Sequence, residues 1–245
     1  MPEPLLTRFL QPLLAGRRRE CLSLIQAAGN PDSAAHLMCE VIWPAMGQLQ
    51  RLYNDDHINA ATYNMATLIC HTATGQLQTQ LPQEELNGKR VLICSAERRS
   101  EELGAELITS LFESAGWEAW LIGGGLPYDE LCQLVGQLDP QLLVIFGTEP
   151  TEVPPIRNLI GRIREIGLCP TMNIMVSGGV FNRADGLWEE VGADVQAEEA
   201  QNLIEQANGL SPRIPSAPKL GIVKRRRRRR KTDPAPTETV AAAPA

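Results

Sequence analysis

Short apolar runs that alternate with helical segments between residues 88 and 210 constrain the fold more than any other feature of the sequence. The runs are 90–94, 118–122, 142–146 and 173–176, with a shorter one at 195–196, and a segment of helical periodicity follows each. Apolar runs of this length are typical of strands buried on both faces of a sheet. Their alternation with helices predicts an α/β protein with a parallel, doubly wound sheet. Ligands of such sheets bind outside the carboxyl ends of the strands.

Glycines follow three of these strands. The segments are Gly123-Gly124-Gly125, Gly147-Thr148 and Ser177-Gly178-Gly179. Glycine keeps side chains away from the backbone, so three such strand ends at one edge of the sheet predict an open cleft for a flat or phosphate-bearing ligand. A tight turn between strand and helix explains any one of them equally well, so the prediction depends on all three.

The region before the sheet has a different period. Between residues 7 and 81 apolar residues recur at spacings of three and four, with breaks at Gly16, 29–31 and 54–56. This pattern predicts four short helices. Pro44 is expected to kink a helix or to begin one, because proline cannot donate a backbone hydrogen bond.

The last part of the chain differs again in composition. From residue 211 the sequence is rich in proline, then strongly basic, and it ends in proline, threonine and alanine. Such a composition cannot bury enough apolar surface to offset the entropy of ordering, so we expect 211–245 to be a disordered tail. Its basic run consists of Lys224, Arg225, Arg226, Arg227, Arg228, Arg229, Arg230 and Lys231.

This basic run separates the charge of the chain into two parts. It holds eight of the 23 basic residues, and two of the 29 acidic residues follow it, so residues 1–223 hold 15 basic and 27 acidic residues, a formal charge of −12. Clustered bases can bind the phosphates of a nucleic acid, an acidic protein or anionic lipid. A solubilising tail, or one that contacts its own acidic domain, explains the run equally well.

Several features of the sequence argue against a membrane-spanning, secreted or enzymatic protein. No apolar run approaches the roughly 18 residues of a membrane-spanning helix, and prolines and an arginine cluster at 17–19 interrupt the N-terminal region where a signal peptide has its apolar core. The six cysteines form no CxxC pair, which is typical of a reduced compartment. We therefore expect a cytoplasmic protein without a membrane span. No nucleophile set, P-loop or GxGxxG motif is present, so we expect no enzymatic activity.

Landmarks in both halves of the chain resemble those of a known family. In the helical half they are 14–17, 44–46 and the spacing from 52 to 58; in the sheet half they are 116–118 before Gly123-Gly124, then 139–142, 177–181 and 192–194. In order and spacing they resemble the cobalamin-binding module of methionine synthase, of corrinoid methyltransferase carriers and of light-sensing cobalamin regulators. The resemblance implies a four-helix-bundle cap over 5–82, followed by a flavodoxin-like domain over 88–210.

The central motif of that family is altered here. The family's DxHxxG loop supplies a histidine to cobalt and an aspartate that fixes the histidine tautomer. Gly104 keeps the glycine of the motif, but Glu101 stands at the histidine position and Arg99 at the aspartate position. A carboxylate is a poor ligand for low-spin cobalt, and an arginine cannot replace the anion. We therefore do not expect a corrinoid to be bound through a histidine of this loop.

The cap is altered as well. The tryptophan and the glutamate-histidine pair that face the corrin in the family align with Tyr53, Tyr63 and Asn64. The strand-end serine falls at Gly147, with Thr148 beside it as a substitute. His71, two helical turns after Asn64, is a candidate for a substitute upper ligand, although a lone helical histidine is more often an ordinary partly buried residue.

Three functions remain open after these departures. The first is a sensor or regulator that binds cobalamin or a related tetrapyrrole and signals to a transcription or signalling partner, with nucleic-acid contact through the basic run and no sequence-reading element. The second is a scaffold that has lost its cofactor and binds proteins; the third, ranked last, is a methyl-carrier subunit. A homo-oligomer is compatible with each. The predicted ligand contacts are Tyr53, Tyr63, Asn64, Glu101, Gly104, Thr148, Gly178 and Gly179.

Overall fold

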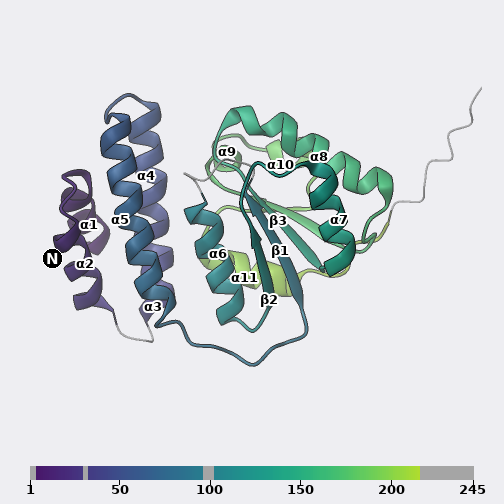
Figure 1. The fold of residues 1–245 in the computed structure, drawn as a ribbon, viewed down its shortest axis with the longest axis horizontal. Helices are drawn as coiled ribbons and strands as arrows, with labels where there is room; N and C mark the ends of the chain where they lie inside the picture. The colour runs from purple at the N-terminus through teal and green to yellow at the C-terminus, as the bar shows by residue number, and fades with distance from the viewer. Residues whose placement is uncertain (1–3, 30–32, 96–101, 216–245) are drawn as a thin grey trace, which may run out of the picture. The chain divides into compact units, whose positions relative to one another are not determined.

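The computed structural model describes residues 4–29, 33–95 and 102–215, and Figure 1 shows them as a helical part followed by an α/β part. Glu101 and the basic run at 224–231 lie outside the described residues. Within the described ranges no helix is long and apolar enough to cross a membrane.

The helical part confirms the four predicted helices, because three of its segments join into one continuous helix. Its elements are α1 (Leu5–Leu14), α2 (Arg18–Ala28), α3 (Ala34–Leu37), the π-helical η2 (Met38–Ile42), α4 (Trp43–Asn54) and α5 (Ala60–Gln78). The segments α3, η2 and α4 follow one another without a break and form this continuous helix. Pro44 explains the wider π turn before it, because a proline ring collides with the carbonyl four residues earlier in a regular α-helix.

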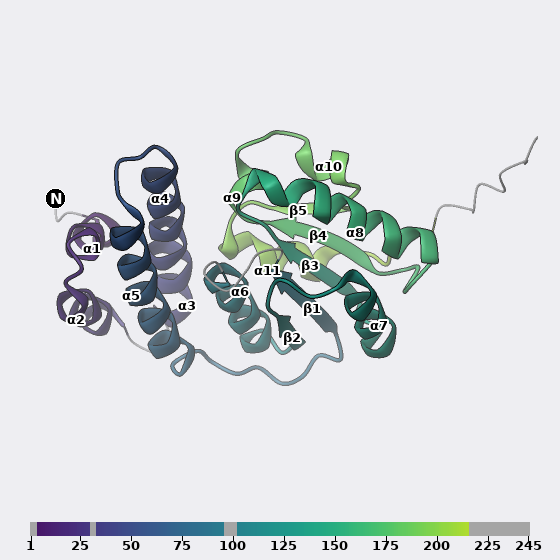
Figure 2. The same ribbon diagram turned by 45° about the horizontal axis from the view of Figure 1, so that its top comes forward.

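The α/β part contains a five-stranded sheet whose neighbours are all parallel, in the order β2-β1-β3-β4-β5 (Figure 2). This is the doubly wound, flavodoxin-like order that the sequence predicts. Its strands are β1 (Arg90–Ser95), β2 (Glu118–Ile122), β3 (Leu142–Phe146), β4 (Asn173–Ser177) and β5 (Val195–Ala197). Its helices are α6 (Leu103–Ser114), α7 (Tyr128–Leu138), η3 (Pro150–Glu152), α8 (Val153–Ile166), α9 (Gly179–Asn182), α10 (Leu187–Val191) and α11 (Ala200–Gly209).

The two faces of the sheet carry separate cores. Successive side chains of a strand point to opposite faces, so Leu143 and Ile145 of β3 join the core under α7 and α8. Leu142, Val144 and Phe146 join the core under α6 and α11. The last side chain of β3, Phe146, therefore points to the face that α6 covers.

Helix α6 connects the helical cap to the sheet. Its residues Leu103, Leu107 and Leu111 belong to the core of the cap, whereas Ile108 and Phe112 belong to the core of the sheet. The Gln78 amide of α5 also donates a hydrogen bond of 2.6 Å to the Ser110 hydroxyl of α6. Because α6 is buried on two faces, it fixes the cap beside the strand ends.

All six cysteines are free, as expected for small apolar side chains rather than a disulfide framework. Burial raises the pKa of the Cys70 and Cys94 thiols to about 12, so both remain protonated and unreactive near neutral pH.

A candidate ligand cleft between the cap and the strand ends

The strand ends approach each other closely at the carboxyl edge of the sheet. The Gly147 amide, directly after β3, donates a hydrogen bond of 2.9 Å to the carbonyl of Ser177 at the end of β4. Gly178 has a φ of +107°, and a Cβ at this position would lie 2.2 Å from the Gly147 carbonyl oxygen. Gly178 therefore cannot be replaced without moving the neighbouring strand end. The backbone of the neighbouring strand end thus requires glycine here, whereas the prediction that these glycines leave room for a ligand stays a prediction.

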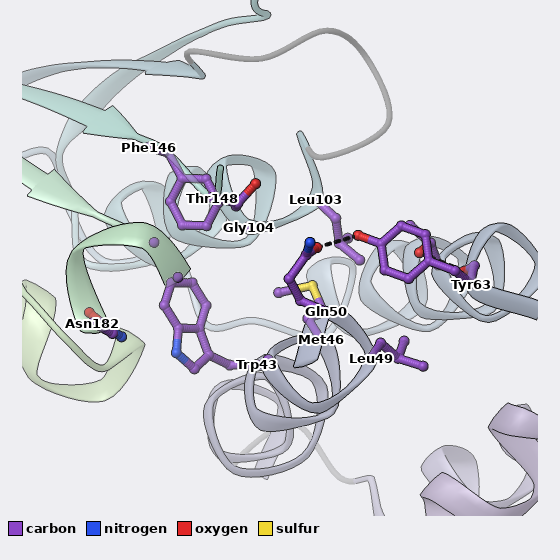
Figure 3. A pocket seen from close by; sticks show the side chains of 14 residues that line it. Trp43, Met46, Leu49, Gln50, Tyr63, Leu103, Gly104, Phe146, Thr148 and Asn182 are labelled. Carbon is purple, nitrogen blue, oxygen red and sulfur yellow. Dashed lines mark hydrogen bonds between the residues drawn. The ribbon is translucent and has the colours of Figure 1, made fainter. Parts of the chain in front are cut away.

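A cavity of about 110 Å³ lies where the cap meets these strand ends (Figure 3). Five of the predicted contact residues line it together: Tyr63, Gly104, Thr148, Gly178 and Gly179. Sequence reasoning missed other lining residues, among them Trp43, Met46, Gln50, Leu103, Phe146 and Asn182. The alternation of side chains along β3 was the one signal that could have identified Phe146 as a residue of this face.

A chain of hydrogen bonds joins the cap to the loop after β3. The Tyr63 hydroxyl donates to the Gln50 side-chain oxygen at 2.7 Å, as Figure 3 shows. The Gln50 amide then donates to the Glu149 carboxylate at 2.7 Å and to the Asn54 side-chain oxygen at 3.0 Å. Gln50 is 8% exposed, so its polar groups are satisfied by the protein rather than by solvent. We call the contacts among Tyr63, Gln50 and Glu149 the cap latch.

Two aromatic rings close the inner side of the cavity. Trp43 of the cap meets Phe146 of β3 edge to face, with ring centroids 5.8 Å apart. On its other side the Phe146 ring lies over Gly104, where an added Cβ would be 2.3 Å from the ring. Phe146 is 6% exposed. Gly104 is thus matched to the ring of Phe146, which fills the space between the end of β3 and the start of α6.

A buried carboxylate supports the loop after β3. Glu152 is buried, and its Oε2 accepts hydrogen bonds from the amides of Thr148, at 2.9 Å, and Glu149, at 3.2 Å. Its Oε1 is buried and has no hydrogen-bond partner among the described residues. Burial raises the pKa of Glu152, and the two amides partly offset this effect by stabilising the carboxylate. Glu152 therefore holds Thr148 at the cavity from behind.

Other predicted contacts lie apart from the cavity. Tyr53 does not line it but stacks on Tyr63, with ring centroids 4.7 Å apart, and Asn64 is exposed and does not line it either. His71 faces α6, with its Nδ1 3.2 Å from the Glu106 carboxylate. Its hydrogen bond lowers the pKa of Glu106. The structure thus gives His71 a contact between cap and sheet and does not place it at the cavity.

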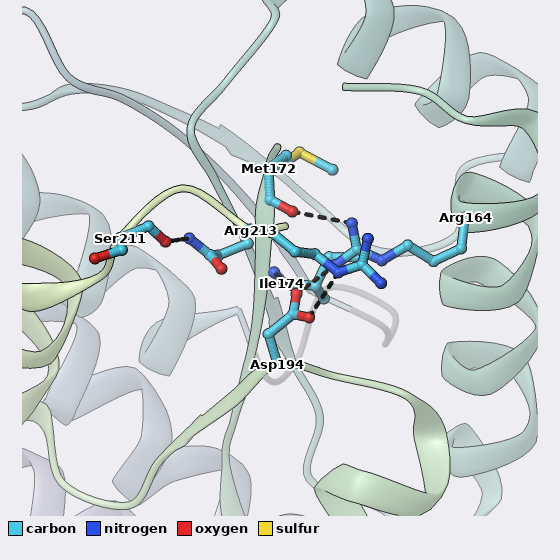
Figure 4. Close-up of polar contacts among 7 residues, drawn as sticks. Arg164, Met172, Ile174, Asp194, Ser211 and Arg213 are labelled. Atoms are coloured by element: carbon cyan, nitrogen blue, oxygen red, sulfur yellow. Dashed lines mark hydrogen bonds and ion pairs between the residues drawn. The ribbon is translucent and has the colours of Figure 1, made fainter. Parts of the chain in front are cut away.

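A second polar cluster lies at the opposite edge of the sheet (Figure 4). The Asp194 carboxylate accepts from the Ile174 amide at 2.8 Å and forms ion pairs with Arg164 and Arg213. The Asn173 side chain also donates to the carbonyl of Ser211 at 3.0 Å. The sequence predicts a disordered tail from residue 211, but these contacts attach 211–215 to the sheet domain, so the prediction is corrected for these residues. The physical reason is that the Arg213 guanidinium pairs with the carboxylate of Asp194, the residue directly before β5.

A parallel sheet of this order preceded by a helical cap is the architecture of the module that the sequence resembles. No protein-family model matches the chain. Dimethylamine corrinoid protein 1 of Methanosarcina acetivorans is 19% identical over 211 residues, 85% of this chain and 98% of that protein. Dimethylamine corrinoid protein 3 of the same organism is 21% identical over 210 residues, 85% of this chain and 97% of that protein.

Among solved structures, the monomethylamine corrinoid protein of Methanosarcina barkeri superposes with a TM-score of 0.70 at 17% identity, covering 83% of this chain and 96% of that one. The similarity therefore extends through both the cap and the sheet. These findings confirm the predicted resemblance to the cobalamin-binding domain family.

Small and apolar residues line the cleft, and this lining does not fit histidine ligation of a corrinoid's metal. The residues that follow the strand ends are small: Gly178, Gly179 and Thr148. Apolar side chains of the cap line the same cavity. The three histidines of the sequence are His36, His57 and His71, and none of them lines the cavity. Among the residues described, no group of three His, Cys, Asp or Glu side chains could hold a metal ion.

The size of the cavity sets a further condition. At about 110 Å³ it is smaller than the roughly 300–1,000 Å³ of pockets for drug-sized molecules, and a corrinoid is larger than these. A macrocycle can therefore enter only if the cap separates from the strand ends.

Proposed function

We propose that this chain is a corrinoid-binding protein of the carrier type, which holds a corrinoid between the cap and the strand ends without a protein histidine as its lower ligand. The observation that supports it best is the meeting of Tyr63, Gly104, Thr148, Gly178 and Gly179 at one cavity. The relatives, which are named corrinoid proteins, match along nearly their whole length. The role proposed is binding, with any chemistry on the corrinoid left to a separate partner enzyme.

A carrier role is preferred here to the sensor role predicted from the sequence. The relatives reported above are corrinoid proteins of dimethylamine and monomethylamine systems by name, and none is named as a regulator. A carrier must expose its cofactor to a partner, and a cap that has to separate from the strand ends before a ligand enters is suited to that exchange. Cobalt would supply the site for the carried group when the cofactor is bound.

An ultraviolet-visible titration with hydroxocobalamin and methylcobalamin tests this proposal. We expect saturable spectral changes, lost in Gly179→Trp because the indole fills the space beside the end of β4. Gly161→Trp is the matched control, because a Cβ at Gly161 on α8 meets no atom within 4 Å. Absence of binding at tens of micromolar, about −6 kcal/mol or weaker, would contradict the proposal.

A second function is favoured by a specific observation. Phe146 fills the space beside Gly104, and the histidine of the family motif is missing, as expected if the fold had lost its cofactor. The chain would then act as a protein-interaction module. A titration without binding, combined with an intact fold, favours this function over the carrier.

A further inference from the structure

We propose that Phe146, supported by Trp43, closes the space beneath the strand ends, so that this chain accepts a corrinoid only with its lower nucleotide base left outside the sheet domain. The inference deepens the proposed function and rests on it for the identity of the ligand. It assigns Phe146 as the residue that determines which part of a corrinoid can enter.

The position of Phe146 makes it a barrier rather than a contact at the mouth of the cleft. It is the last residue of β3, at the point where the strand order reverses between β1 and β3 and where doubly wound sheets admit ligands. Its side chain belongs to the core under α6 and α11, and it also lines the cavity. Anything that passed from the cavity into the space between β3 and α6 would have to displace this ring.

The surroundings leave the ring little room to move. Gly104 of α6 lies directly against it, so close that an added Cβ would be 2.3 Å from the ring and 2.7 Å from its next carbon. Trp43 covers the cap side of the ring edge to face at 5.8 Å. With neighbours on the α6 side and on the cap side, a rotation of the ring that clears the path must also move the backbone of α6 or the cap.

The chemistry of the strand ends agrees with this barrier. A base inserted beneath the corrin leaves the lower face of the metal to a protein ligand, and no histidine of this chain lines the cavity. A corrinoid that keeps its own base on the metal, or one that lacks the base, needs neither the inserted space nor a protein imidazole. Phe146 and the missing histidine therefore point to the same mode of binding.

Binding of cobinamide, which lacks the nucleotide, compared with cobalamin tests the assignment. We expect the wild-type protein to bind the two within about threefold of each other, because the base gains no contact. Phe146→Ala should prefer cobalamin about tenfold or more. A wild-type preference for cobalamin above tenfold, with the spectrum of a displaced base, would overturn the inference.

A second probe does not depend on corrinoid binding. Free 5,6-dimethylbenzimidazole, the base itself, should bind Phe146→Ala in the space left by the ring and should not bind the wild type, as measured by ligand-detected NMR. Phe112→Ala is the matched control, because Phe112 is a buried phenylalanine of α6 itself that packs on Trp117 and does not line the cavity. Phe146→Leu opens part of the same space if the alanine variant does not fold.

The outcomes separate the two proposals. If neither cobinamide nor cobalamin binds, the carrier function fails, and the benzimidazole probe alone decides on Phe146. If the wild type binds free dimethylbenzimidazole, or if a folded Phe146→Ala does not, the barrier is not Phe146 and the inference is wrong.

Discussion

Glu152 shows how single residues hold the cleft in shape. Two amides stabilise one of its oxygens, while the other has no hydrogen-bond partner in the described structure. Because burial raises the pKa of this carboxyl, its contribution to stability is greatest below its ordinary value of 4.5 and is lost as the pH rises through the raised value.

Glu152→Gln should therefore reduce the pH dependence of stability. The amide oxygen can still accept from Thr148, but the side chain carries no charge to bury. We expect the free energy of unfolding, measured by urea denaturation between about pH 4 and pH 7, to fall less steeply with rising pH than in the wild type. Glu165→Gln, at an exposed position on α8, is the control, and identical profiles for Glu152→Gln and wild type would contradict this role.

His71 contributes to stability with the opposite pH dependence. Its hydrogen bond lowers the pKa of Glu106, so the pair stabilises the protein above the ordinary Glu pKa of 4.5 and loses this effect as the pH falls through the lowered value. Both side chains are about one-third exposed, which limits the cost of His71→Ala to at most about 1 kcal/mol. The visible spectrum of a bound corrinoid should not change in this variant; a shifted spectrum would show that His71 is a ligand after all.

At the scale of elements, the cap and the sheet are joined by two kinds of contact. Helix α6 supplies an apolar connection through Leu103, Leu107 and Leu111, which does not involve the cavity except at Leu103. The cap latch supplies a polar connection at the cavity itself. The latch must open when a macrocycle enters, whereas the α6 contacts can persist.

Gln50→Ala should therefore increase the affinity for a corrinoid. A hydrogen bond to a charged group contributes about 1.5–3 kcal/mol, and even about 1 kcal/mol less cost of opening corresponds to roughly fivefold tighter binding. The titration of hydroxocobalamin measures this change. Gln48→Ala on the same helix, whose side chain does not line the cavity, should leave affinity unchanged. Weaker binding in Gln50→Ala would instead make Gln50 a ligand contact.

At the scale of the whole molecule, the described chain extends past the last helix. Residues 211–215 return to the amino edge of the sheet, where Arg213 pairs with Asp194 at 3.0 Å. A chain ending after Pro215 should keep the melting temperature of the full chain, and one ending after Leu210 should melt several degrees lower, a loss of about 1–2 kcal/mol. Calorimetry checks both, and Arg213→Ala should reproduce part of the loss. Equal melting temperatures for the two truncations would show that 211–215 contributes nothing.

Acidic and basic residues are unevenly distributed along the chain. The described part is acidic, and the basic run at 224–231 lies beyond it. If the run binds nucleic acid, deletion after Val223 should abolish DNA binding, and the affinity of the full chain should fall steeply with salt because each phosphate contact releases a counterion. DNA binding that survives the deletion would remove the run from this role.

Much of the fold was predicted from local pattern. The strands at 118–122 and 142–146 begin and end at the predicted residues. The run at 142–146 is buried throughout, as its apolar sequence predicts, whereas β2 lies at the edge of the sheet and is partly exposed, so burial on both faces is not confirmed for it. The short helix α9 at 179–182 was not predicted, because four residues are too few for a periodic pattern. Of the five cavity residues that were predicted, Thr148, Gly178 and Gly179 follow strand ends, whereas Tyr63 and Gly104 were found from motif positions on α5 and α6.

Residue identity and the periods of two and 3.6 are enough to predict the doubly wound sheet, the helical cap and the loss of the histidine from the altered motif. Three contacts could be seen only in the folded chain: Phe146 fills the space over Gly104, Gln50 joins the cap to Glu149, and His71 faces Glu106. The physical reason is that these contacts join residues 35 to 99 positions apart, and which of them meet depends on how α4, α5 and α6 pack beside the strand ends.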